Sequence, residues 1–169
     1  MATNLQLLHE EVLTGSTSTI NMTNCFYGSY KDFEVHTNLT KQSGNTGTNL
    51  KLIDSAGSVN SDSTYDWGLY VQKSNTGWSE LRDVNKTSWE NLGGVHDANG
   101  GKHIFRIYNP ISSTQFTYFQ SIGTSWDQGA LRGYRGLGVF SANTSMYGLQ
   151  LGFNDAPVEI GKISVYGVK

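Results

Sequence analysis

Hydrophobic and polar side chains alternate along most of this chain with the two-residue period of a β-strand. Phe33, Val35 and Leu39 fall on one face of their segment, whereas Glu34 and Asn38 fall on the other. Successive side chains of a strand point to opposite sides of a sheet. The pattern therefore predicts strands that each have one buried face and one solvated face.

Ten segments fit this pattern. They are residues 5–13, 18–23, 31–39, 49–53, 65–72, 102–109, 115–122, 131–140, 147–153 and 158–168. Clusters of Gly, Asn, Asp, Ser and Pro separate them, as expected for turns. In the last segment the apolar positions shift across Gly161, which predicts a β-bulge there. Only residues 79–91 could hold a short helix, because Trp78, Leu81, Trp89 and Leu92 in and beside them are loosely spaced three to four residues apart.

Many short strands without helical connections favour two sheets that pack face to face. We therefore expect an all-β fold, an antiparallel two-sheet sandwich of jelly-roll type with about ten strands. The length of 169 residues suits one domain that spans residues 1–169. No linker divides the chain, because the 2 prolines and 20 glycines are scattered along it.

The charge content argues against a nucleic-acid partner. The formal net charge is −2 and only 15% of the residues are charged, whereas a nucleic-acid-binding protein would present a basic surface to phosphates. No segment approaches the roughly 20 apolar residues of a membrane helix, and the first residues do not resemble a signal peptide. We expect a protein made in the cytoplasm, with the single Cys25 buried and without a disulfide.

Candidate catalytic chemistry is sparse. No nucleophile motif or phosphate-binding loop occurs. The histidines lack the spacing of metal ligands; they are His9, His36, His96 and His103. We therefore predict no enzymatic activity and no catalytic, cofactor-binding or metal-binding residues.

A calcium site and a glycosidase carboxylate pair are two further alternatives. Calcium could be bound by loop oxygens in residues 62–66 or at Asp97 and Asn99, although Asx turns explain both loops. A glycosidase would have to combine carboxylates that are distant in the sequence, such as Glu80 and Asp127. Neither arrangement follows from the spacing of the residues.

The four tryptophans divide into two groups. Trp67 lies on the apolar side of its strand and is predicted to be in the core. Trp78, Trp89 and Trp126 lie where alternation is weak, so they are the candidate contacts for a glycan or a protein partner. Exposed tryptophans stack on sugars and fill the pockets of partners, while ordinary packing under a loop is the alternative.

A resemblance to a known group emerges from the whole pattern. The chain opens with spaced leucines from Leu5 to Leu13, and its second half contains the strand GGKHIFRIYNP, the glycine-broken strand GYRGLGVF and the terminal run VEIGKISVYGVK. These strands resemble those of small jelly-roll structural proteins on the outside of tailed-phage virions. Residues 75–96 are the least similar part.

The resemblance implies a non-enzymatic protein on the virion exterior, either a capsid decoration protein or a tail fibre or tail-tip component. Its partners would be other virion proteins, and a symmetric homotrimer is expected. A carbohydrate-binding module that adsorbs to host glycans is the second hypothesis, and a glycan-degrading enzyme is the third. Fold alone does not choose among them.

Overall fold

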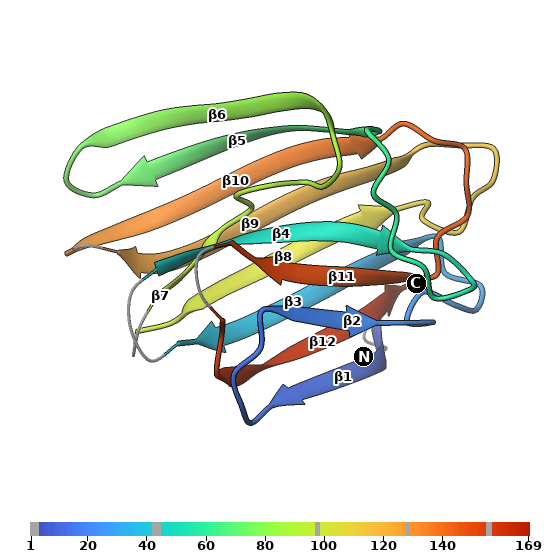
Figure 1. The fold of residues 1–169 in the computed structure, drawn as a ribbon, viewed down its shortest axis with the longest axis horizontal. Coiled ribbons are helices and arrows are strands. Elements are labelled where there is room, and N and C mark those ends of the chain that lie inside the picture. The colour runs from blue at the N-terminus through green and yellow to red at the C-terminus, as the bar shows by residue number, and fades with distance from the viewer. Residues whose placement is uncertain (1–3, 42–44, 97–98, 128, 155–156) are drawn as a thin grey trace.

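The computed structural model describes residues 4–41, 45–96, 99–127, 129–154 and 157–169. Two antiparallel sheets, one of eight strands and one of four, pack face to face (Figure 1). The predicted all-β sandwich is thereby confirmed. No helix occurs in the described ranges, so none there is long and apolar enough to cross a membrane.

The eight-stranded sheet forms the back layer of Figure 1. Every neighbouring pair in it is antiparallel. Its strands, in spatial order, are β1 (Leu5–Leu13), β12 (Ile160–Val168), β3 (Asp32–Thr40), β8 (Gly101–Tyr108), β9 (Thr117–Asp127), β10 (Ala130–Phe140), β5 (Tyr65–Lys73) and β6 (Gly77–Lys86).

The four-stranded sheet lies in front of the larger one and is narrower than it (Figure 1). Its strands, in spatial order, are β2 (Thr19–Met22), β11 (Gly148–Phe153), β4 (Asn45–Ile53) and β7 (Gly94–His96). Consecutive strands β1 to β4 alternate between the two sheets. This alternation is compatible with jelly-roll connectivity, which stays a prediction.

Each of the ten predicted segments coincides with a strand, and the structure adds β6 and β7. The helix considered for residues 79–91 is wrong, because Gly77–Lys86 pairs with β5 along its length. The bulge predicted at Gly161 is also wrong, since the β12–β3 register is unbroken there. The apolar shift has another cause: Val158 is buried before the strand begins, and Ile160 is exposed.

The core between the sheets contains a run of aromatic rings. Trp89 stacks on Phe119 with ring centroids 4.7 Å apart, and Tyr65 meets Trp89 edge-on at 5.3 Å. Phe140 also packs against Tyr65, with ring centroids 5.0 Å apart. The indole Nε1 of Trp89 donates a hydrogen bond to the Val139 carbonyl at 3.2 Å, so the buried polar group is satisfied.

Trp89 reaches this position because the segment after β6 crosses the sandwich from the large sheet to the small one (Figure 1). Trp89 forms an isolated bridge with Leu50, and their backbone groups exchange two hydrogen bonds. Cys25 and Trp67 are buried in the same core cluster, as predicted.

Several core-facing positions of β9 and β10 carry small residues, namely Ser121, Gly123, Ser125, Gly136 and Gly138. A Cβ atom at Gly138 would lie 2.8 Å from Trp89 Nε1, and one at Gly123 would lie 1.9 Å from His103 Cδ2. His103 is buried and stacks parallel to Phe105. Two large rings therefore fill the space that side chains of β9 and β10 would otherwise occupy.

Replacing Trp89 with alanine is expected to lower the free energy of unfolding by about 3–5 kcal/mol, because a large buried ring is lost and a cavity remains. Urea denaturation measures this loss. The matched control is Trp78→Ala, which removes a tryptophan that is 68% exposed and should change stability by less than about 0.5 kcal/mol. Equal losses for the two variants would contradict the core assignment.

Gly123→Ala is expected to destabilise the protein by about 1–3 kcal/mol, because the new methyl group would overlap the His103 ring. Gly68→Ala is the control on the same sheet, since nothing lies within 4 Å of its added Cβ. The control should be neutral or slightly stabilising. Thermal unfolding of both variants tests the comparison, and a neutral Gly123→Ala would show that His103 is not tightly held.

Candidate functional site

The candidate site is the outer face of the large sheet, defined as the outward-pointing side chains of β5, β8, β9 and β10. The apolar pattern is inverted on its two central strands. In β9 the core-facing positions after Phe119 are Ser121, Gly123 and Ser125, whereas Ile122 and Trp126 point outward. The large apolar side chains on this surface thus add nothing to the core of the sandwich.

Neighbouring strands bring these exposed residues together. In the register of β9 and β10, Trp126 lies opposite Leu131, and Gln120 opposite Leu137. Ile122 lies opposite Ile104 on β8. The exposed fractions are 60% for Ile122 and 64% for Leu137. Other large side chains on the outer face that are about half exposed are Tyr70, Tyr118, Trp126 and Leu131.

An ion-pair cluster borders this apolar surface on β3 and β8. The largely buried carboxylate of Glu34 accepts a hydrogen bond from Arg106 Nε at 2.8 Å and lies 2.9 Å from His36 Nε2. The His36 ring packs against Tyr166, with centroids 4.9 Å apart. On the adjacent strands, the Tyr108 hydroxyl donates to Gln120 Oε1 at 3.0 Å.

The cluster controls the ionisation of Glu34. Burial by itself would raise the pKa of the carboxyl group, but the hydrogen bonds and charges of His36 and Arg106 outweigh it and lower the pKa. The Glu34 charge in turn raises the pKa of Arg106. The group is therefore a fixed anion near neutral pH, held by two donors on the surface of the sheet.

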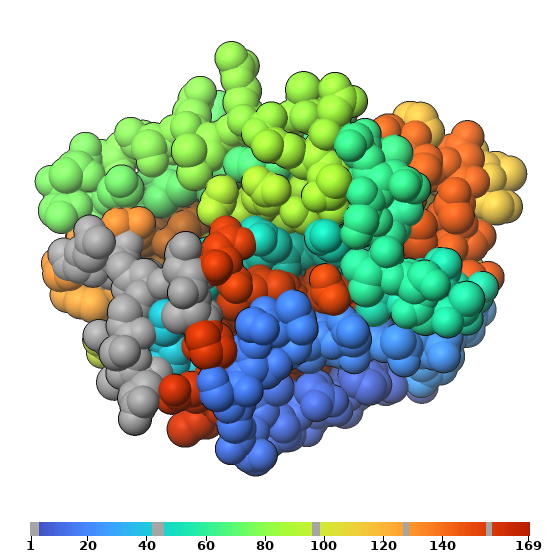
Figure 2. Space-filling model, in the orientation of Figure 1, coloured from blue at the N-terminus to red at the C-terminus, as the bar shows by residue number. Residues whose placement is uncertain are grey.

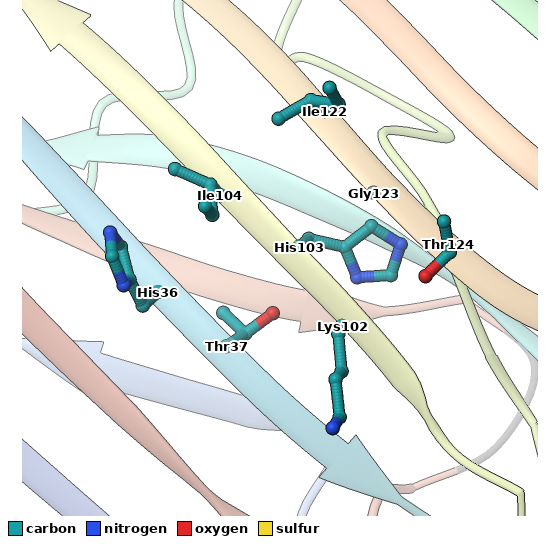
Figure 3. Close-up of a pocket in the computed structure, with 8 residues that line it drawn as sticks. All are labelled: His36, Thr37, Lys102, His103, Ile104, Ile122, Gly123 and Thr124. Carbon is teal, nitrogen blue, oxygen red and sulfur yellow. The ribbon is translucent and has the colours of Figure 1, made fainter.

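A shallow hollow of about 410 Å³ lies where the apolar surface meets this cluster, across β3, β8 and β9. Figure 3 shows His36, Ile104 and Ile122 along one side of it and Lys102 and Thr124 along the other. Gly123 and the edge of the buried His103 ring beneath it complete the lining. The hollow can receive a side chain from a partner, but it does not enclose a small molecule.

The three candidate tryptophans have different environments. Trp126 is 48% exposed on the outer face, and Trp78 is 68% exposed at the start of β6. Trp89 is fully buried and is withdrawn as a contact residue, since its ring lies between the sheets. Trp78 and Trp126 both point outward near one end of the large sheet, three strand spacings or about 14 Å apart across it.

Other residues considered from the sequence are not brought together. Glu80 lies on β6 and Asp127 ends β9, with β5 and β10 between these strands. The backbone positions are thus at least about 14 Å apart across the sheet, beyond the spacing of a glycosidase pair. The side chains of Asp127 and His96, and all of Asp97, lie outside the described part of the structure. No group of three metal-ligating side chains occurs in the described ranges.

Sequence reasoning missed most of the outer face. The alternation in residues 115–122 predicted a strand with one buried face, but it did not show that Tyr118 and Ile122 share an exposed face with Trp126. The available signal was the placement of Ser and Gly at the alternate positions of the same strand. The signal was overlooked because alternation alone assigns large apolar residues to the core.

Glu34→Gln is expected to reduce the free energy of unfolding by about 1 kcal/mol at neutral pH, since the partner Arg106 is 57% exposed and solvent screens its attraction to Glu34. The folded protein lowers the pKa of Glu34, so the stabilisation exists above the unfolded pKa and disappears as the pH falls through the folded pKa. The difference between wild type and variant should therefore shrink below about pH 4.

Urea denaturation at a series of pH values measures this difference. Glu159→Gln is the matched control, because Glu159 makes no ion pair with the residues that the structure describes. A Glu34→Gln difference that is as large in acid as at neutral pH would contradict the assignment of an ionised carboxylate.

Comparison with known proteins adds little to this geometry. No protein family model matches the chain, and no curated protein sequence matches it. Among solved structures, an exo-inulinase from Aspergillus awamori is similar over 98% of this chain, with 11% sequence identity and a TM-score of 0.37. The chain spans 29% of the length of that enzyme. A likeness this distant does not bear on the function.

Proposed function

We propose that this chain is a non-enzymatic structural protein on the exterior of a tailed-phage particle, and that it binds another virion protein through its outer face. The observation that carries the proposal is the inverted pattern on β9 and β10. Ile122 and Leu137 are exposed where the core-facing neighbours are Ser or Gly. An apolar patch that the chain's own core does not require is typical of a docking surface.

The composition of the outer face supports a protein partner. Leucine and isoleucine side chains stand beside tyrosines, Trp126 and the arginines Arg106 and Arg135. Aromatic residues and arginine are enriched in protein interfaces, and they supply much of the binding energy there. The Glu34 ion pairs lie at the edge of the patch, where charges favour orientation and specificity over affinity.

The sequence resemblance indicates where this surface would be used. It implies a place on the virion exterior, as a capsid decoration protein or a tail fibre or tail-tip component, and a homotrimeric assembly. The outer face is suited to either location, since both require a rigid module that binds a larger protein lattice or fibre. The two locations remain alternatives within one proposal.

A carbohydrate-binding module is the second candidate function. It is favoured by the exposure of Trp78 and Trp126 near one end of the sheet, because tryptophan rings stack on sugars. The aliphatic side chains between the aromatic ones favour the protein partner, since sugar hydroxyls need polar groups beside each ring. Gln120, the amide nearest the centre, already accepts a hydrogen bond from Tyr108.

The double variant Ile122→Glu/Leu137→Glu tests the proposal. It should remain folded, because both side chains are more than half exposed, yet its binding to phage particles assembled without this protein should fall by at least about tenfold. Co-sedimentation with the particles measures the binding. Val12→Glu is the matched control, since Val12 is 59% exposed on the edge strand β1, which β12 and β3 separate from the four strands of the outer face.

Trp126→Ala separates the two candidate functions. Binding of wild type to host polysaccharide that Trp126→Ala abolishes, together with unchanged particle binding by the double variant, would overturn the protein-docking proposal in favour of glycan recognition. Loss of particle binding in the double variant, with binding retained in Val12→Glu, supports the protein-docking proposal.

A further inference from the structure

Strand β6 is a long, free edge of the large sheet. It pairs with β5 on one side, and no strand of the described residues pairs with it on the other (Figure 1). No strand of the small sheet covers it, and in Figure 2 the β5–β6 hairpin forms one margin of the molecule. Trp78, Leu81 and Val84 on this strand are 68%, 44% and 62% exposed. An edge of this kind offers unpaired backbone groups to another strand.

Some charged side chains of β6 have partners within the chain, and one does not. Asp83 and Lys86 form an ion pair at 2.9 Å, and Glu80 interacts with the Tyr70 hydroxyl on β5. Arg82 has no carboxylate partner among the described residues. It points outward on the same face of the sheet as Glu80, two positions further along the strand.

We propose that β6 pairs antiparallel with β6 of a second copy of this chain, with Leu81 opposite Leu81, to form a continuous sheet across a two-fold axis. This register places Glu80 of each copy opposite Arg82 of the other. Trp78 then lies opposite Val84. Opposite charges and apolar side chains directly across an antiparallel pair stabilise it.

The symmetry limits the choice of register. With a two-fold axis perpendicular to the sheet, residues directly opposite each other point to the same face of the sheet. Each possible register therefore has one residue on the axis, opposite its own copy, and neighbouring registers shift that residue by one position. Moving the centre one position toward the N-terminus places Glu80 opposite itself, and moving it one position toward the C-terminus places Arg82 opposite itself. Like charges directly opposite each other are destabilising. The Leu81-centred register therefore avoids both repulsions.

This contact is separate from the outer-face docking proposed above, and it differs from a three-fold contact. A two-fold contact alone produces a dimer, and combined with the homotrimer that the sequence resemblance implies it produces a six-chain assembly. A single strand pair with flanking side chains is small beside a standard interface of roughly 1,600 Å². The association should therefore be weak, and it should weaken further with added salt.

Charge reversal tests the pairing. Glu80→Arg creates two Arg–Arg contacts across the axis, and Arg82→Glu creates two Glu–Glu contacts, so each variant should raise the dissociation constant by about tenfold or more. The double variant Glu80→Arg/Arg82→Glu restores both opposite-charge pairs. An equimolar mixture of the two single variants should also associate, because only the mixed pair is complementary.

Sedimentation equilibrium of the full chain over a concentration series measures the assembly mass. Twice or six times the 18.6 kDa of one chain, lost in the single variants and regained in the double variant and the mixture, supports the proposal. A monomer at every concentration, a trimer without further association, or single variants that associate like wild type would overturn it. Glu11→Arg, on the opposite edge strand β1, is the charge-matched control and should associate like wild type.

Discussion

The packing of two rings, Trp89 and His103, against the core-facing surface of β9 and β10 determines much of this structure. Trp89 stacks on Phe119 and lies against Gly138, while His103 lies against Gly93 and Gly123. Interiors are packed to crystal-like density, so these rings and larger side chains on the same strand positions exclude each other. The small residues of β9 and β10 are therefore required for the two sheets to approach.

This constraint separates the core from the outer face. Beside Phe119, Tyr134 and Phe140 of these strands, rings from other segments fill the core side of β9 and β10. The aliphatic and aromatic residues on the outside of these strands have no part in the core. They form a surface of Ile122, Leu137 and their neighbours beside the ordered Glu34–Arg106 ion pair. A rigid sheet that presents such a surface loses little conformational entropy on binding, which favours a structural role.

The sequence predicted the fold better than the site. Alternation identified ten strands, because those strands bury one face each. It could not identify β6, where nearly every side chain is exposed and the two-residue period carries no burial signal. Strand β7 is only three residues long. Trp89 could not be assigned to the core from local pattern, since its burial depends on a crossing segment that meets Leu50 in the other sheet.

Cryo-electron microscopy of purified phage particles, at a resolution that traces this chain, shows directly whether the outer face binds another virion protein. We expect density of another virion protein packed against Ile122 and Leu137 on the outer face, repeated over the head or confined to the tail. If this chain is traced on the particle with the outer face open to solvent in every copy, the outer face is not a docking surface for a virion protein.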